Sequence, residues 1–138
     1  MNVIGSDRSR ELRRHLARTC DLDEGTVSAA LMTLIGSIHD RLSHSVEVSL
    51  VSWIPETWGF LTEDGRDLFG RPPRGLPAMR QRLMDAGVAE EQTDVFIIEF
   101  VRYLERRCSS ALAASLRRRI PEFVQCEQER AVTGSLQA

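Results

Sequence analysis

The sequence of 138 residues contains no lysine, so arginine supplies all 18 of its positive charges. Schiff-base catalysis through lysine and P-loop nucleotide binding both need a lysine, and both are therefore excluded. The 20 acidic residues outnumber the arginines and leave a formal net charge of −2. A chain with this charge has no overall positive field to attract nucleic acid or anionic lipid.

Cysteine is scarce as well, since Cys20, Cys108 and Cys126 form neither a CxxC pair nor a disulfide framework. We expect Cys108 to be a small core residue and Cys126, near the chain end, to be an exposed thiol. His39 and His44 lie five residues apart across a helix break, which is not the spacing of a helical metal-ligand pair. We therefore expect no metal site, no cofactor and no catalytic residue.

Long apolar runs are also missing. The longest uncharged one, residues 26–38, is well short of the roughly 20 residues of a membrane-spanning helix. The first residues become charged at Asp7 and contain no apolar core of a secretion signal. We expect a cytoplasmic protein with no membrane partner. Its 42% of hydrophobic and 28% of charged residues are typical of one globular domain.

The chain contains one segment twice. Residues 26–56 align without a gap with residues 92–122, at an offset of 66. Seven of the 31 aligned positions are identical, where unrelated sequences would share about two. Both copies end in the same tripeptide, Ile54-Pro55-Glu56 and Ile120-Pro121-Glu122. The repeat predicts that a helical unit has been duplicated.

Apolar residues in the repeat recur at spacings of three and four, which is typical of helices with one buried face. No stretch shows the strict alternation of a strand. We predict an all-α fold of two tandem helical repeats, about eight helices, packed as one bundle-like domain. A pseudo-twofold axis or a solenoid-like stacking would relate the repeats. The helix that carries Val95, Ile98, Val101 and Leu104 is the more apolar of the two long ones and is expected to be central.

Glycine and proline mark the expected boundaries within the single domain of residues 1–138. They place repeat one at about 7–61, a linker at about 62–76, repeat two at about 77–128 and a disordered tail at about 130–138. Ser6 or Asp7 is expected to cap the first helix. Pro55 and Pro121 suit the first turn of a following helix, where the missing N–H is no loss, and the isoleucine before each should be buried.

The repeat ends carry a family resemblance. The matching positions are Arg41-Leu42, Leu50, Ile54-Pro55-Glu56 and Trp58, then Arg107, Leu116, Ile120-Pro121-Glu122 and Phe123. In this pattern the chain resembles a bacterial domain-of-unknown-function family made of two tandem helical repeats, each ending in an (Ile/Leu)-Pro-Glu motif. Trp53 and Arg119 stand where a glutamine is commoner in that family. The resemblance implies a fold and a bacterial origin, and no catalytic residues.

Two arginine clusters are the first candidates for a functional surface. Arg10, Arg13 and Arg14 share part of one helix face, and Arg117, Arg118 and Arg119 follow one another in the third helix of repeat two. The hypothesis is that the clusters lie within one Debye length, about 8 Å at physiological salt, and act together on an anionic partner. The alternatives are a solvated face neutralised by glutamates and a protein-partner surface. Aromatic residues do not interleave with these arginines, which disfavours single-strand binding.

Aromatic residues are a second candidate, either as an exposed partner surface or as the completion of a thin helical core: Trp53, Trp58 and Phe69. We expect a non-enzymatic helical protein-interaction module that binds a protein partner or associates with itself as a homodimer. One alternative is a regulator that contacts nucleic acid or phosphate through the arginine clusters. Another is a small-molecule or lipid pocket between the repeats, lined by Leu34, Ile38, Ile98 and Phe100.

Overall fold

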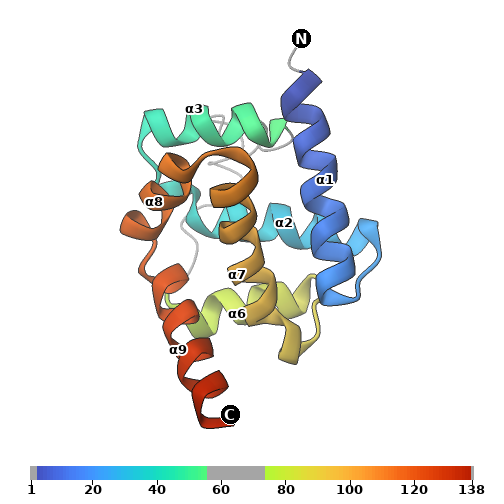
Figure 1. Ribbon diagram of the computed structural model, residues 1–138, viewed down its shortest axis with the longest axis vertical. Coiled ribbons are helices and arrows are strands. Elements are labelled where there is room, and N and C mark those ends of the chain that lie inside the picture. Colours follow the sequence, from blue (N-terminus) through green and yellow to red (C-terminus); the bar gives the residue numbers. More distant parts are fainter. Residues whose placement is uncertain (1–2, 56–73, 138) are drawn as a thin grey trace.

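The regular elements of the chain are helices throughout residues 3–55 and 74–137, which are the residues that the computed structural model describes (Figure 1). In chain order the α-helices are α1 (Val3–Cys20), α2 (Glu24–Ile38), α3 (His44–Trp53), α6 (Leu76–Asp85), α7 (Thr93–Tyr103), α8 (Ser110–Arg119) and α9 (Pro121–Gln137). Short helical turns adjoin two of them: η1 (His39–Arg41) follows α2, while η3 (Glu90–Gln92) and η4 (Leu104–Cys108) flank α7. The predicted all-α fold is confirmed. The helix expected at 55–61 and nearly all of the expected linker lie outside the described residues.

Helix α7 occupies the centre of the molecule, as its apolar sequence predicts. It packs against α1, α6, α8 and α9, and Figure 1 shows it in front of α2 with α1 on one side and α8 and α9 on the other. Its side chains Phe96, Ile97, Phe100 and Val101 are completely buried. The hydrophobic core therefore forms around this one helix.

The duplicated segment adopts the same local structure in both copies. Helix α3 plus the offset of 66 gives the bounds of α8 without adjustment. Each begins at a serine cap, where the hydroxyl of Ser43 or Ser109 accepts a hydrogen bond from the backbone N–H three residues later. Each ends where the N–H of Ile54 or Ile120 donates to the carbonyl of a leucine four residues earlier, at 2.8 Å in both copies.

The two isoleucines that close these helices are buried, as predicted, with exposed fractions of 1% for Ile54 and 0% for Ile120. Pro121 is the first residue of α9, which is the predicted first-turn position. The equivalent of Glu122 in repeat one, Glu56, lies outside the described residues.

The helices pack between the two repeats as well as within each of them, since α1 also contacts α2 and α3 of its own repeat and α6 also contacts α7 and α9. Helix α1 contacts α7 of the other repeat, α6 contacts α2 of the other repeat, and α3 contacts α8. A solenoid would keep the early helices of each repeat against their own neighbours. The reciprocal contacts instead follow a pseudo-twofold arrangement, which was one of the two that the sequence left open.

The turn after the first helix of each repeat is also equivalent. The N–H of Leu22 donates to Ala17 and the N–H of Val88 donates to Leu83, at 2.9 and 3.0 Å, and both pairs are related by the offset of 66. These are the long hydrogen bonds of Schellman caps, which need a left-handed residue between. Gly87 has φ of 110° there, and a Cβ on it would lie 2.9 Å from Thr26. Asp21 occupies the same place in repeat one, with φ of 54°.

Two helix ends differ from the sequence prediction. Helix α1 begins at Val3, ahead of the caps expected at Ser6 or Asp7. Helix α9 continues to Gln137, although the sequence suggested an end near residue 128 and a disordered tail. Residues 125–131 contain mainly strong helix formers, and no proline or glycine follows Pro121 before Gly134, so backbone propensity continues the helix where apolar packing has ended.

We predict that Ile54→Ala and Ile120→Ala each lower the free energy of unfolding by about 2–5 kcal/mol, because each leaves a cavity in a fully packed core. The measurement is urea unfolding followed by circular dichroism. Val48→Ala is the control, because Val48 lies on α3, the helix that Ile54 closes. Val48 is 56% exposed, so its truncation should change stability by less than about 0.5 kcal/mol. Equal losses at Val48 and Ile54 would contradict the assigned packing.

We predict that Asp21→Gly raises the free energy of unfolding by up to about 1 kcal/mol, because glycine adopts the left-handed conformation without the Cβ clash that Asp21 carries. Gly87→Ala should do the opposite, since it adds that clash and a close contact with Thr26. Thermal unfolding of the two variants beside the wild type measures both. Shifts of the same sign would show that the two turns are not equivalent.

Candidate functional site

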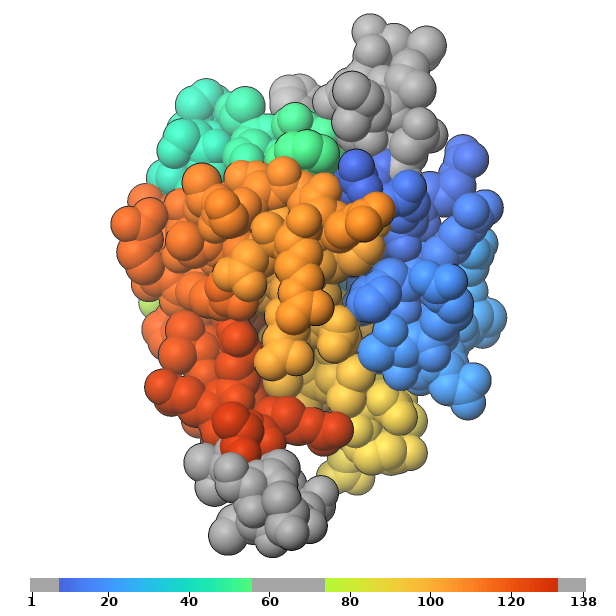
Figure 2. Space-filling view, in the orientation of Figure 1, coloured from blue at the N-terminus to red at the C-terminus, as the bar shows by residue number. Residues whose placement is uncertain are grey.

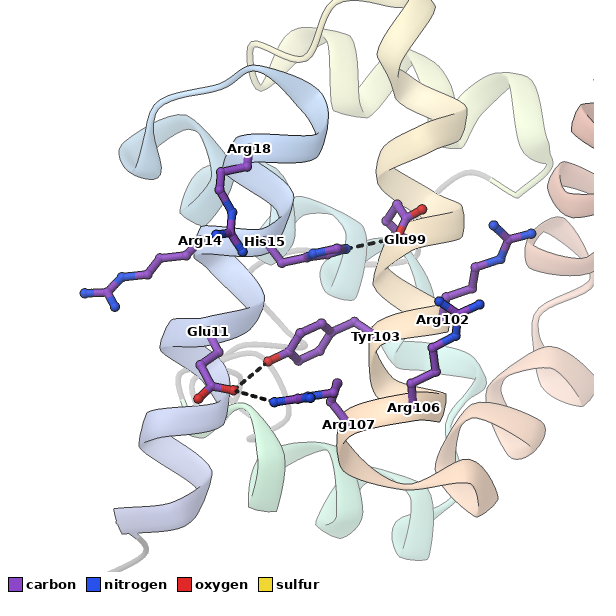
Figure 3. Close-up of a pocket in the computed structure, with 9 residues that line it drawn as sticks. All are labelled: Glu11, Arg14, His15, Arg18, Glu99, Arg102, Tyr103, Arg106 and Arg107. Atoms are coloured by element: carbon purple, nitrogen blue, oxygen red, sulfur yellow. Dashed lines mark hydrogen bonds and ion pairs between the residues drawn. The ribbon is translucent and has the colours of Figure 1, made fainter.

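A cleft of about 460 Å³ lies between α1 and the helical segment formed by α7 and η4 (Figure 3). It brings together residues from the two repeats and is lined by five arginines. The lining residues are Glu11, Arg14, His15 and Arg18 from α1, Glu99, Arg102 and Tyr103 from α7, and Arg106 and Arg107 from η4.

Helix periodicity explains why these side chains line one opening. On α1 the cleft residues recur at spacings of three and four beside an apolar stripe that contains Leu12, Leu16 and Cys20, which is buried. The cleft residues of α7 recur with the same spacing beside its own apolar face. Helix α7 then widens into the π-type turn η4, where the N–H of Ser109 donates to the carbonyl of Leu104 at 2.7 Å. Such turns are frequent at functional sites, and this one carries Arg106 and Arg107.

Two side-chain contacts cross the floor of the cleft from α1 to α7 (Figure 3). The hydroxyl of Tyr103 donates to Glu11 at 3.0 Å, and Nε2 of His15 lies 3.0 Å from the carboxylate of Glu99. The His15 and Tyr103 rings are in contact, with centroids 5.5 Å apart. The floor is therefore fixed by hydrogen bonds, and its two carboxylates face the opening as acceptors.

These contacts shift the acidity of the groups that form them. Burial, together with the hydrogen bond to Glu11, raises the pKa of the Tyr103 hydroxyl. The hydrogen bond from Tyr103, together with the charges of Arg8 and Arg107, lowers the pKa of Glu11. At neutral pH the floor therefore holds a neutral phenol bound to an ionised carboxylate.

The arginines stand along the edges of the cleft. Arg14 and Arg18 are four residues apart on α1, and Arg102 and Arg106 have the same spacing on the facing segment. Arg14 and Arg107 each have a carboxylate at 3.8 Å, whereas no ion pair within the described residues involves Arg18, Arg102 or Arg106. All five are exposed. With two glutamates the cleft has a formal charge of +3, in a chain whose net charge is −2.

The structure places the sequence-predicted arginines in different surroundings. Arg14 lines the cleft, Arg13 donates to the hydroxyl of Ser9, and Arg10 is exposed outside the lining. In the second cluster, Arg117 forms ion pairs with Glu105 and Glu127, which raise the pKa of its guanidinium. Arg117 therefore fits the alternative of an arginine neutralised by glutamates. Arg118 donates to Ser115, and Arg119 is exposed. The arginines that join Arg14 in the cleft are Arg18, Arg102, Arg106 and Arg107.

The other predicted residues lie elsewhere. Trp53 is partly buried and packs against the core, while Trp58 and Phe69 lie outside the described residues. The four residues expected to line an apolar pocket are core residues with at most 4% exposed: Leu34, Ile38, Ile98 and Phe100. The cleft that the structure contains is polar and lies in another place.

The three cysteines and His39 are parts of the packing, whereas His44 is exposed. Cys126 is completely buried, so the expectation of an exposed thiol is wrong; it lies three residues after Phe123 on the face of α9 that packs against α7. Burial raises the pKa of Cys20 and Cys108 to about 11 and that of Cys126 to about 12. Nδ1 of His39 lies 2.6 Å from the carbonyl of Gly36. Within residues 3–55 and 74–137, no group of three or more histidine, cysteine or carboxylate side chains is placed to hold a metal ion.

The positions of repeat one that are equivalent to the α7 and η4 side of the cleft carry different residues. At the offset of 66, Arg102, Tyr103 and Arg106 correspond to Gly36, Ser37 and Asp40. Gly36 and Ser37 are buried. The residues that form the core are retained between α2 and α7, whereas those that line the cleft are not.

Arg107 does have an arginine counterpart, Arg41, but Arg41 is buried in an ion pair and Arg107 is exposed. Arg41 donates to both carboxylate oxygens of Glu122, at 2.8 and 2.7 Å, in a pair with 10% and 7% of the side chains exposed. Glu122 also accepts from the backbone N–H of Gly75 at 3.3 Å. The hydrogen bonds from Arg41 lower the pKa of the Glu122 carboxyl. Arg41 is therefore structural, and Arg107, with 58% of its side chain exposed, faces the cleft.

No protein-family model, no curated protein and no solved structure matches this chain. Among the helices of the described residues, none combines the length and the apolar character needed to span a membrane.

We predict that Glu122→Gln lowers the free energy of unfolding at neutral pH by about 3–5 kcal/mol, because it leaves the buried Arg41 charge without its partner. The folded-state pKa of Glu122 is below its ordinary value of 4.5, so its contribution is complete above that value and is lost as the pH falls through the folded pKa. Denaturant unfolding at neutral and acidic pH should therefore show the difference between wild type and variant narrowing in acid.

Glu24→Gln is the matched control, because Glu24 lies 3.8 Å from Arg14 in an exposed pair whose removal should cost less than about 1 kcal/mol at any pH. A Glu122→Gln variant as stable as this control would show that the buried pair does not hold the repeats together.

Proposed function

We propose that this protein is a non-enzymatic interaction module whose α1–α7 cleft binds an acidic segment of a protein partner. The observation that carries the proposal is the set of exposed arginines along both edges of the cleft, three of them without an ion pair among the described residues. Unpaired surface arginines on an acidic protein form a local site that attracts carboxylates, whatever the sign of the net charge. Guanidinium groups also bind carboxylates through two parallel hydrogen bonds.

The floor of the cleft favours a peptide over a nucleic acid. Glu11 and Glu99 present acceptors between the arginines, and a peptide supplies both backbone N–H donors for this floor and side-chain carboxylates for the edges. A nucleic-acid backbone carries acceptors alone at its phosphates. Tyr103, the aromatic residue of α7 at the cleft, is only 9% exposed, so its ring is not open as a surface on which a base could stack.

The internal repeat supports a specialised role for the cleft. Packing requires the same core positions in both halves, but it does not require Arg102 and Arg106, whose counterparts are Gly36 and Asp40. Both arginines are exposed, and neither forms an ion pair with another of the described residues. We also propose, on the basis of the repeated tripeptide, that this chain is a bacterial, cytoplasmic member of the tandem-repeat family that it resembles.

The test compares two double variants with the same change in charge. We predict that Arg102→Glu/Arg106→Glu weakens binding of a fluorescently labelled oligoglutamate peptide by about tenfold or more, which corresponds to ~1.4 kcal/mol, whereas Arg118→Glu/Arg119→Glu changes it little. Fluorescence anisotropy in a series of salt concentrations measures the affinity, and binding should weaken as salt is added.

A parallel titration with single-stranded DNA separates the alternative. Tighter binding of the DNA, with the same dependence on Arg102 and Arg106, would replace the acidic segment by a nucleic acid. Equal losses in both double variants would show attraction without a site, and no loss in either would end the proposal.

A further inference from the structure

One end of the cleft is bordered by an acidic surface that the proposed function does not use. It is made by the two equivalent turns, residues 20–25 and 85–92, and we call it the acidic end. Its exposed acidic residues are Asp21, Asp23, Glu24, Asp85, Glu90 and Glu91. The second turn lies against the start of α2, directly after the first turn, since a Cβ on Gly87 would lie 2.9 Å from the side chain of Thr26. The duplication has thus placed two acidic turns together.

Several of these carboxylates have a hydrogen-bond or ion-pair partner within the chain, and others have none among the described residues. Asp23 caps α2 by accepting from the N–H of Thr26 at 2.7 Å, and Glu24 lies 3.8 Å from Arg14. Asp85 accepts from the side-chain amide of Gln81. Glu90 and Glu91 have no ion pair or side-chain hydrogen bond among the described residues. Two glutamates of the acidic end and three arginines of the cleft, Arg18, Arg102 and Arg106, therefore form no ion pair among the described residues.

The acidic end and the cleft are neighbours on one face. Helices α1 and α7 are in contact and run in opposite directions, so the C-terminal end of α1 and the start of α7 lie at the same end of the cleft (Figure 1). Figure 2 shows both helices on the same face of the molecule. At 1.5 Å per residue, α7 rises about 14 Å from Thr93, the residue after η3, to Arg102, so Glu90 and Glu91 lie well away from the arginines of their own chain's α7.

We propose that the anionic partner of the cleft is a second copy of this chain, whose Glu90 and Glu91 enter the cleft and bind Arg102 and Arg106. This inference rests on the proposed function. A twofold dimer places each surface region opposite the region beside it on the partner, provided that the axis passes between them. The cleft of each copy then contacts the acidic end of the other, so the dimer contains two equivalent contacts between opposite charges.

The size of the contact sets its strength. A cleft of this volume and one acidic turn form a small, charged interface, which gives weak association that depends on concentration and salt. The wild type should therefore form a dimer at low salt and high protein concentration. It should dissociate when salt is added or when the protein is diluted.

The experiment is a charge exchange between the two surfaces. The cleft variant is Arg102→Glu/Arg106→Glu, and the acidic-end variant is Glu90→Arg/Glu91→Arg. Each should be monomeric alone, because positions 90 and 91 of one copy then carry charges of the same sign as positions 102 and 106 of the other. An equimolar mixture should form the dimer again. At one contact the glutamates at positions 102 and 106 of the cleft variant face the arginines at positions 90 and 91 of the other variant, and at the second contact the unchanged Arg102 and Arg106 face the unchanged Glu90 and Glu91. Sedimentation velocity at low salt measures the mass in each case.

Controls separate folding and function from association. Glu90 and Glu91 precede α7, so their reversal is also unfavourable for the helix dipole; Glu90→Gln/Glu91→Gln avoids this reversal and should still weaken the dimer at least threefold. Arg118→Glu/Arg119→Glu should dimerise like the wild type. A wild type that stays monomeric at every concentration, or a mixture that stays monomeric, overturns the inference. If the cleft still binds oligoglutamate in that case, the proposed function stands; if it does not, both fall.

Discussion

The buried pair of Arg41 and Glu122 is the interaction on which the arrangement of the two repeats depends. It joins η1 of the first repeat to the first turn of α9 in the second, and through the N–H of Gly75 it also fixes the start of α6. A guanidinium and a carboxylate removed from water are costly unless they satisfy each other, so the chain has few alternative ways to pack these three segments. The apolar contacts between α1 and α7 and between α2 and α6 then follow from one fixed point.

The sequence predicted the parts of the fold that local patterns determine. The tripeptides Ile54-Pro55-Glu56 and Ile120-Pro121-Glu122 located the ends of α3 and α8, because a proline ends the helix before it and an isoleucine at that spacing faces the core. The equivalence of the turns at Asp21 and Gly87 was missed, since the two residues are not identical. They share a backbone property, the ability to adopt positive φ, that a count of identities does not detect.

The cleft was predicted only at Arg14, and the reason is geometrical. Three consecutive arginines, Arg117 to Arg119, form an obvious cluster in a sequence, but successive helical residues point about 100° apart and these three contact different neighbours. Arg102 and Arg106 are four residues apart and therefore share a helix face, but they are not consecutive and do not form a visible cluster in the sequence. Spacing alone gives these faces; that α1 packs beside α7, and not beside α6, depends on long-range contacts that no local pattern contains.

The reciprocal contacts of α1 with α7 and of α6 with α2 give this single chain the arrangement of a symmetric dimer of two units. A symmetric pair of separate units would present each groove twice, and a substitution that opened one groove would open both. Fusion into a single chain removes that restriction. The groove against α2 has the small, buried residues Gly36 and Ser37, while the groove against α7 has Arg102 and Tyr103 at the equivalent positions. Within one chain, two grooves at equivalent places can therefore differ in the residues that line them.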